Sequence, residues 1–230
     1  MNTKFLLLCP ADNSKLRAEW TSGKNEVERI TCPINQGHAR PGRRLSPLDV
    51  SLSKLPGERS LVWTWYGELL ASQAVVDLLR VNGFTGFNAI PAIVRTRRAE
   101  MVRTAFFELC ITGWGGLPAR ESGIRRIQHC PGCNLSIYSC FDDGKHLIDV
   151  DQWDGSDFFF VWPAPRFLFV PAGVVEMLTR EKISGWAARE LAEVNCSSQL
   201  TPGALDCWLP LDKIDEIRAR VGPDGAEFFD

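Results

Sequence analysis

The sequence predicts an α+β fold in which two related strand-helix-strand halves are joined by a pair of zinc-ribbon-like knuckles. Segments typical of strands outnumber the two or three convincing helices, which argues against a regular βαβ alternation. A stretch of the chain repeats itself 99 residues later, and a Cys-Pro pair recurs at nearly the same spacing. We therefore expect one compact domain over residues 1–230, with halves of about 28–95 and 126–194 and an irregular C-terminal wrap over 197–230.

The repeat is clearest when residues 62–92 are laid over residues 161–191 without a gap. Eight of the 31 positions are then identical: Val62/Val161, Trp63/Trp162, Leu69/Leu168, Val75/Val174, Val76/Val175, Leu79/Leu178, Gly86/Gly185 and Ala89/Ala188. At a spacing of 98, Cys32-Pro33 falls on Cys130-Pro131. Because the Cys-Pro, Trp and Gly landmarks recur in the same order, we interpret the pattern as an internal duplication.

Each half is predicted to contain one amphipathic helix. The first begins at Ser72, which suits the N-cap, and runs to about Asn82, where Gly83 can end it. Its buried face is expected to hold Val75, Leu78, Leu79 and Asn82. The second helix has Pro171 in its first turn, and its buried face is expected to hold Val174, Val175, Leu178 and Glu181.

Strands are predicted where Phe, Trp, Val and Ile gather between Gly, Pro or Asp residues. In chain order these segments are Phe5 to Leu8, Ser60 to Trp65, Phe87 to Val94, Val102 to Thr112, Leu135 to Ser139, Asp157 to Trp162 and Trp186 to Leu191. The tail is rich in Pro and Gly, and we expect one short helix in it, near Leu211 to Val221.

Composition excludes several classes of function. The chain has 26 Lys+Arg against 28 Asp+Glu, so nothing in its overall charge favours nucleic acid or an anionic membrane. The longest apolar stretch near the N-terminus, Phe5 to Cys9, is too short for a signal peptide or a membrane span, and we expect a cytoplasmic protein. In that compartment the 8 Cys are better explained as metal ligands and small apolar residues than as four disulfides.

The strongest chemical signal is Cys130-Pro131-Gly132-Cys133, which lies between two strand-like segments. Such a knuckle lets two thiolates converge on one tetrahedral ion, and a closed site needs two more ligands. The corresponding place in the first half has Cys32, then Asn35 in the slot of Cys133, then His38. We predict a structural Cys3His zinc site formed by Cys32, His38, Cys130 and Cys133.

Four other residues are of a type that could bind zinc and remain alternative ligands: Cys9, His129, Cys140 and His146. The alternative to a metal site is that the cysteines pack as small apolar side chains. Cys110, Cys196 and Cys207 have no partner at a useful spacing, and we interpret them as packing residues. A thioredoxin-like redox role would need a helix after the CxxC, whereas Leu135 to Ser139 resembles a strand.

Two kinds of charged cluster occur, and the acidic one is interpreted as structural. The acidic run around Trp153 contains Asp142, Asp143, Asp149, Asp151, Asp154 and Asp157, and its Asp-Gly turns are typical of a solvated loop. The basic clusters are Arg40, Arg43 and Arg44, and then Arg95, Arg97, Arg98 and Arg103. These arginines keep a nucleic-acid-binding or regulatory zinc-ribbon protein as the alternative function.

The two Cys-Pro knuckles, each followed by a Trp-bearing strand and a helix, resemble the double-CXXCG motif family of bacterial immunity proteins. The resemblance spans about Lys4 to Val194 and includes Phe84 to Phe87 and Trp153 to Trp162. It implies bound zinc and a protein partner, a cognate toxin. The chain departs from the family pattern, because its first knuckle lacks the second Cys and Asn134 stands where the second motif has Gly.

No phosphate-binding loop, nucleophile elbow or zincin motif is present, and the chain has only 3 His. The sequence therefore predicts a non-enzymatic, zinc-stabilised protein with no membrane partner. The resemblance implies that it neutralises a cognate toxin by direct binding. An unrecognised metal-dependent enzyme is a third hypothesis, and it would need an open coordination position on the metal.

Overall fold

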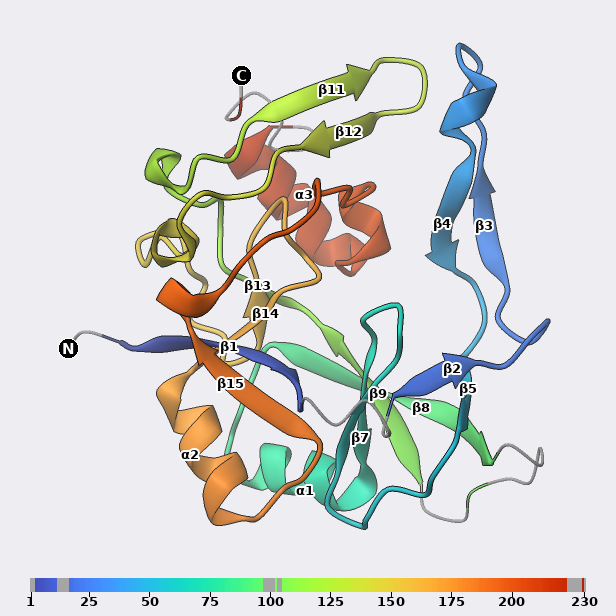
Figure 1. The fold of residues 1–230 in the computed structure, drawn as a ribbon, viewed down its shortest axis with the longest axis vertical. Helices are drawn as coiled ribbons and strands as arrows, with labels where there is room; N and C mark the ends of the chain where they lie inside the picture. The colour runs from blue at the N-terminus through green and yellow to red at the C-terminus, as the bar shows by residue number, and fades with distance from the viewer. Residues whose placement is uncertain (1–2, 12–16, 97–101, 103–104, 223–228, 230) are drawn as a thin grey trace.

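The computed structural model describes residues 3–11, 17–96, 102, 105–222 and 229 (Figure 1). In these residues the chain is a mixed α+β fold made mostly of strands, which confirms the predicted class. It has three α-helices here: α1 (Gln73–Val81), α2 (Ala172–Arg180) and α3 (Leu211–Val221). None of these helices is long and apolar enough to cross a membrane.

Most of the strands belong to two sheets. Their bounds are β1 (Phe5–Pro10), β2 (Ala18–Trp20), β5 (Asp49–Leu52), β6 (Leu61–Trp63), β7 (Leu69–Ser72), β8 (Phe87–Thr96), β9 (Phe106–Ile111), β10 (Gly113–Trp114), β13 (Phe159–Phe160), β14 (Leu168–Pro171) and β15 (Trp186–Glu190). The five-stranded sheet has the order β10-β13-β14-β1-β15, and the six-stranded sheet has the order β2-β5-β8-β9-β7-β6.

Two further hairpins stand at one end of the molecule. They are β3 (Val27–Ile30) with β4 (Arg40–Arg44), and β11 (Arg126–Cys130) with β12 (Leu135–Tyr138). Figure 1 shows both above the two sheets, with α3 beside them. The strands of the first hairpin were not among the predicted ones, because they are short and largely polar.

The elements around α1 and α2 correspond closely. β7, α1 and β8 begin 99 residues before β14, α2 and β15, and both helices have nine residues. The same backbone bond closes each helix: Phe84 N–H donates to the carbonyl of Leu79 at 3.0 Å, and Ile183 N–H donates to that of Leu178 at 2.9 Å. The spacing seen in the sequence is therefore also a spacing of secondary structure.

In each sheet, the two strands that flank the helix pair with a third strand that lies outside the predicted halves. β9 pairs antiparallel with both β7 and β8, and β1 pairs in the same way with β14 and β15. Glu108 lies opposite Leu70, and Leu7 lies opposite Phe169, which is 99 residues after Leu70. β1 and β9 thus occupy matching positions, 101 residues apart, with Phe, Leu and Cys identical at Phe5/Phe106, Leu8/Leu109 and Cys9/Cys110.

Two glycine turns bring the halves into close contact. Gly86 and Gly185 have φ of 87° and 91°, a region that L residues rarely adopt. A Cβ at Gly86 would collide with the carbonyl oxygen of Phe158, and a Cβ at Gly185 would collide with that of Leu61. The turn of each half therefore lies against a segment of the other.

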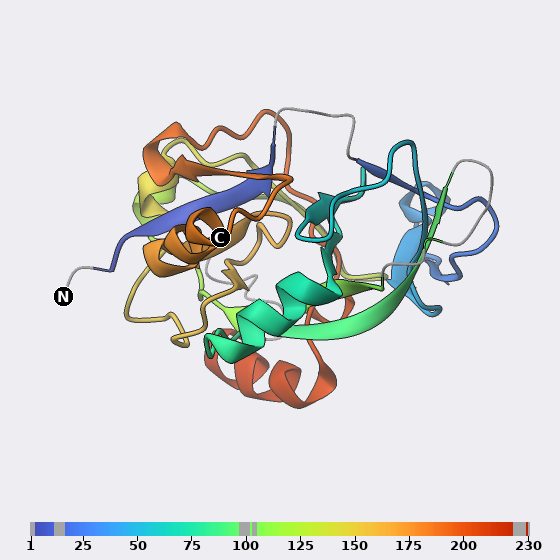
Figure 2. The same ribbon diagram turned by 90° about the horizontal axis from the view of Figure 1, so that it is seen from below.

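A shared apolar core lies between the two helices and the sheets (Figure 2). Its buried residues come from both halves: Leu6, Leu8, Leu61, Trp63, Leu69, Ala71, Val75, Val76, Leu79, Leu109, Phe158, Leu168, Val170, Val174, Met177, Leu178 and Ile183. Trp162 is buried in a second core with the C-terminal segment. Trp63 and Trp162 are thus both buried, in different clusters.

The predicted helices are found with small differences. Ser72 is the N-cap of α1, although its side chain makes no capping hydrogen bond. Asn82 and Glu181, which we expected on the buried faces, are C-cap residues. Val76 and Met177 are buried instead, and Leu78 and Val175, also expected there, are half-buried. Each helix ends just before a left-handed residue, Gly83 or Lys182.

The predicted strands are found at shifted ends. Ser60 to Trp65 becomes β6 and Asp157 to Trp162 becomes β13, both shorter than expected. The predicted strand Val102 to Thr112 becomes β9, and residues 103–104 lie outside the described part of the chain. The helix expected in the tail is α3, with the predicted bounds.

Candidate metal centre

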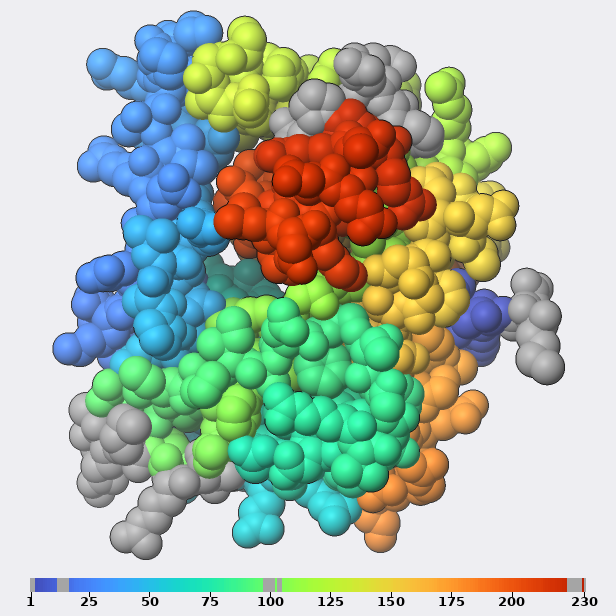
Figure 3. Space-filling model, turned by 180° about the vertical axis from the view of Figure 1, so that it is seen from behind, coloured from blue at the N-terminus to red at the C-terminus, as the bar shows by residue number. Residues whose placement is uncertain are grey.

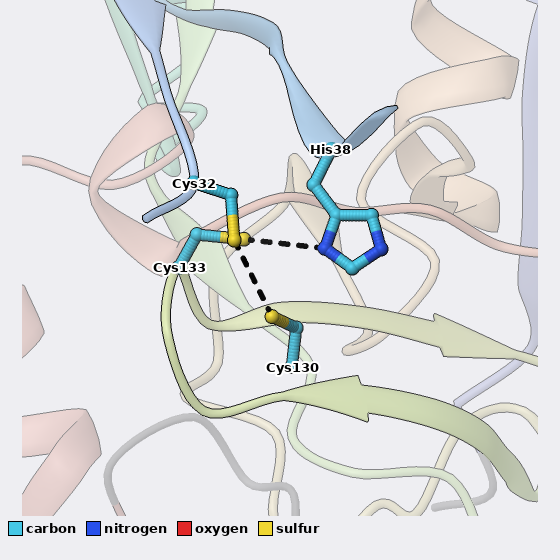
Figure 4. A group of neighbouring side chains, drawn as sticks. All are labelled: Cys32, His38, Cys130 and Cys133. Atoms are coloured by element: carbon cyan, nitrogen blue, oxygen red, sulfur yellow. Dashed lines mark hydrogen bonds between the residues drawn. The ribbon is translucent and has the colours of Figure 1, made fainter. Parts of the chain in front are cut away.

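The two hairpins bring four side chains together at one point (Figure 4). Cys32 follows β3, His38 precedes β4, Cys130 ends β11, and Cys133 lies in the turn before β12. One ligand atom of each lies within 4.8 Å of every other. These are the four residues that the sequence singled out, although Cys32 and Cys130 are 98 positions apart.

The distances suit a small tetrahedral ion. Cys32 Sγ lies 3.6 Å from Cys130 Sγ, and Cys133 Sγ lies 3.8 Å from His38 Nδ1. A tetrahedral Zn²⁺ with Zn–S bonds of about 2.3 Å places its sulfur ligands about 3.8 Å apart. Three thiols and one imidazole are also the donor types that zinc prefers, so the residues present fit the ion.

Backbone amides point at the sulfur atoms in both hairpins. The amides of Gly132 and Cys133 hydrogen-bond to the sulfur of Cys130. In the first hairpin the amide of Asn35, at the position corresponding to Cys133, donates to Cys32 Sγ at 3.3 Å. Such N–H···S bonds stabilise thiolates, and they show that the first turn keeps the knuckle geometry without its second Cys.

Asparagine supports the turn in each hairpin. Asn35 Oδ1 accepts a hydrogen bond from the amide of Gly37 at 2.8 Å, which caps the short 3-10 turn that carries His38. Asn35 Nδ2 lies 3.2 Å from His38 Nε2, on the side of the ring away from the cluster. In the second hairpin Asn134 has φ of 52°, a left-handed conformation that Asn adopts more readily than most residues.

Arg40 connects the first hairpin to the second. Its Nη1 donates to Cys133 Sγ at 3.3 Å, and its Nη2 donates to the carbonyl of Cys133 at 2.8 Å. Burial raises the pKa of Cys133, but hydrogen bonds from Arg40, the backbone of Leu135, Cys32 and His38 outweigh it and lower that pKa to about 6. Cys133 thus ionises more readily than an ordinary thiol, and Arg40 offsets part of the negative charge of a three-thiolate site.

The alternative ligands do not join the cluster. Cys9, His129, Cys140 and His146 lie outside the group of four. The interpretation of Cys196 as a cysteine without a partner was wrong, because it forms a disulfide with Cys140 across a Cα–Cα distance of 5.4 Å. Their separation of 56 residues follows no motif, and the disulfide ties the end of the second hairpin to the C-terminal segment.

A hollow of about 660 Å³ opens beside the cluster. Figure 3 shows it between the first hairpin and the C-terminal segment. Its lining includes Arg40, Cys133, Cys207 and Arg218, with Glu28 and Asp206 as acidic members. Burial and the nearby Asp206 raise the pKa of Cys207, which is held as a neutral thiol.

Most arginines of the predicted basic clusters that the structure describes make internal contacts. Arg44 pairs with the buried Glu108 on β9, and Arg95 binds Asp49 through Nε and Nη2 at 2.8 to 3.1 Å. Arg43 is exposed. Arg97, Arg98 and Arg103 lie outside the described residues. The sequence had not indicated the Arg44–Glu108 and Arg40–Cys133 contacts, since each joins segments far apart in the chain.

No protein-family model and no curated protein sequence matches this chain. The resemblance to the double-CXXCG motif family is therefore still a prediction based on the residues quoted above.

Proposed function

We propose that the chain is a non-enzymatic binding protein stabilised by one structural zinc ion, and that its partner is a bacterial toxin. The observation that carries the proposal is the convergence of Cys32, His38, Cys130 and Cys133 from two separate hairpins. In a zinc-bound protein the ion would tie the two hairpins together, which contributes folding free energy directly.

A structural role is favoured over a catalytic one. Four protein ligands complete a tetrahedral shell, whereas a catalytic zinc keeps one position for water or substrate. Cys32 and Cys130 are buried, and the N–H···S bonds around them are typical of a closed site. These features support a metal that holds a binding surface rigid.

We also propose that the two halves arose by duplication and that the knuckle pair joins them. The support is the common spacing of 99 residues for β7, α1 and β8, and the matched places of β1 and β9. The glycine turns at Gly86 and Gly185 add a reciprocal contact. A duplicated fold of this kind places two similar hairpins side by side, which is how one ion can take ligands from both.

The metal test uses purified protein. Elemental analysis should find one zinc per chain, and Cys130→Ser should lose it together with thermal stability. Cys207→Ser is the matched control, because that thiol lies outside the four-residue cluster, and it should keep the zinc. Full retention of zinc in Cys130→Ser would show that Cys130 is not a ligand.

The partner proposal is supported by the resemblance to immunity proteins, and it has its own test. The toxin-like product of a neighbouring gene is expressed with and without this chain, and the two purified proteins are mixed. We expect survival only with this chain, and binding with a Kd near the nanomolar range. Failure of rescue against every neighbouring gene product would count against a role in immunity.

The alternative of a nucleic-acid-binding or regulatory zinc-ribbon protein is less well supported. Arg40, Arg44 and Arg95, three of the arginines that suggested it, contact Cys133, Glu108 and Asp49 in the structure. This alternative predicts binding to DNA or RNA that weakens steeply with salt. Absence of binding at low salt would remove it.

A further inference from the structure

Two large aromatic side chains stand exposed in the turn between β6 and β7. Trp65 is 55% exposed and Tyr66 is 56% exposed. Aromatic residues of this size dominate the binding energy of protein interfaces. Figure 1 shows the turn projecting from the six-stranded sheet beside β2.

The turn is held rigid by Thr64. Its Oγ1 accepts hydrogen bonds from the amides of Tyr66 at 3.1 Å and Glu68 at 3.2 Å, and it donates to the carboxylate of Glu68. The backbone amide of Thr64 also donates to the carbonyl of Glu68 at 2.9 Å. The two aromatic rings are therefore presented on a fixed turn, which lowers the entropy cost of binding through them.

The fold does not require aromatic residues at these two positions. In the corresponding turn of the second half, 99 residues later, Ala164 and Pro165 replace Trp65 and Tyr66. Ala164 is only 1% exposed, so the second turn folds onto the core. The exposed aromatic pair is thus a property of one half, and burial in the core does not explain it.

Further side chains extend the two rings into a surface. The ring of Trp20 lies 4.8 Å from that of Tyr66, and the guanidinium of Arg17 lies 4.8 Å from the centre of the Trp65 ring. Arg166 Nη1 donates to the carbonyl of Tyr66 at 3.1 Å. We call Arg17, Trp20, Trp65, Tyr66 and Arg166 the aromatic turn surface.

The aromatic turn surface is positive. Among the described residues neither Arg17 nor Arg166 forms an ion pair with a carboxylate. Of the nearby acidic groups, Glu68 keeps its charge but its carboxylate faces Thr64 within the turn, and Glu19 points to the face of β2 opposite Trp20 because side chains alternate along a strand. An acidic partner would complement this charge.

We propose that the aromatic turn surface is the docking site for an acidic face of a protein partner, with Trp65 and Tyr66 as its apolar anchors. This inference rests on the proposed partner-binding function and names the surface through which the partner is bound. Arg and aromatic residues are the types enriched in interface hot spots, which fits a partner that offers carboxylates and apolar side chains together.

The test uses a probe of that chemistry, a random copolymer of glutamate and tyrosine, with polylysine as the control polymer. Binding is measured by fluorescence anisotropy of the labelled polymer at low salt. We expect saturable binding of the acidic copolymer and none of polylysine. Trp65→Ala and Arg17→Glu should each weaken binding at least about tenfold.

Two control variants change similar residues elsewhere. Val81→Ala removes an apolar side chain that is 84% exposed, and Arg43→Glu reverses an exposed charge on β4. Both should bind as the unchanged protein does. Thermal unfolding of each variant shows whether it is folded. If Trp65→Ala does not fold, Tyr66→Ala is the second variant that tests an anchor residue.

Absence of binding, or equal weakening by Arg43→Glu and Arg17→Glu, would overturn the proposal. Neither result depends on the zinc content or on rescue from a toxin. Failure of this surface is therefore distinguishable from failure of the proposed function: a chain that rescues against its toxin equally well with Trp65→Ala binds that toxin elsewhere.

Discussion

Gly185→Ala tests the close contact between the two halves. Gly185 has φ of 91°, and a Cβ there would collide with the backbone oxygen of Leu61. The left-handed backbone costs an L residue about 1–2 kcal/mol, and forcing extra volume against a fixed backbone costs about 1–3 kcal/mol. The sum is a loss of about 2–5 kcal/mol in the free energy of unfolding.

Two other glycines separate these contributions. Gly155 has φ of 84° but nothing within 4 Å of its Cβ position, so Gly155→Ala should cost only the conformational part, about 1–2 kcal/mol. Gly173 lies in the first turn of α2 with open space around it, and Gly173→Ala should stabilise the protein by up to about 0.5 kcal/mol.

The assay is urea denaturation of the three variants beside the unchanged protein, followed by circular dichroism. From most to least stable, we expect Gly173→Ala, the unchanged protein, Gly155→Ala and Gly185→Ala. In a chain of this size the last variant should melt about 4–20 °C lower than the unchanged protein. If Gly185→Ala were no less stable than Gly155→Ala, the turn would not lie against Leu61.

Three further predictions concern charge, the metal centre and the disulfide. Burial raises the pKa of Asp49, but hydrogen bonds from Arg95 outweigh it and lower that pKa. The ionised Asp49 therefore stabilises the fold above about pH 4, and this contribution is lost as the pH falls through the lowered pKa. The free energy of unfolding of Asp49→Asn, measured against pH, should lack this acid-dependent loss. Arg40→Ala should weaken zinc binding by about 10–100-fold in a competition with a chelator, and Arg43→Ala should leave it unchanged. Cys196→Ser should lower the free energy of unfolding by about 2–4 kcal/mol. A reductant should lower the stability of the unchanged protein but not that of this variant, which has no Cys140–Cys196 disulfide to reduce.

The elements that the sequence predicted correctly are those that depend on residues close together in the chain. Ser72 and Gly83 enclose the first helix, and the apolar spacing between them is that of an amphipathic helix, so the position of α1 was correct within a residue. The four clustered side chains were found because a Cys-Pro pair repeats at almost the same spacing as the helices. Comparing the two repeated segments therefore indicated a contact between residues that are 98 positions apart.

The pairing of β1 with β14 and β15 could not be predicted in the same way. β1 and β9 are 101 residues apart rather than 99, and they share only three identities, so the repeat extends to them in a shifted register. β1 also pairs with strands that lie more than 150 residues later in the chain, and no local pattern encodes such a distant pairing. The halves predicted at residues 28–95 and 126–194 include neither β1 nor β9.

Contacts between single side chains were missed for the same physical reason. Cys140 and Cys196 carry no spacing that distinguishes a disulfide from two separate thiols. Arg40 was counted in a basic cluster, although its guanidinium lies against Cys133. Charge patterns along the chain show which residues are ionised, and only the folded structure shows which partner each one has.

We propose that three thiolates and one imidazole from the two hairpins hold a single zinc ion. X-ray absorption at the zinc edge of the purified protein tests it most directly, because the spectrum reports the type and number of ligands. We expect one zinc per chain with three sulfur ligands at about 2.3 Å and one nitrogen at about 2.0–2.1 Å. A chain without zinc, or a zinc shell that contains oxygen or a different number of sulfurs, would contradict it.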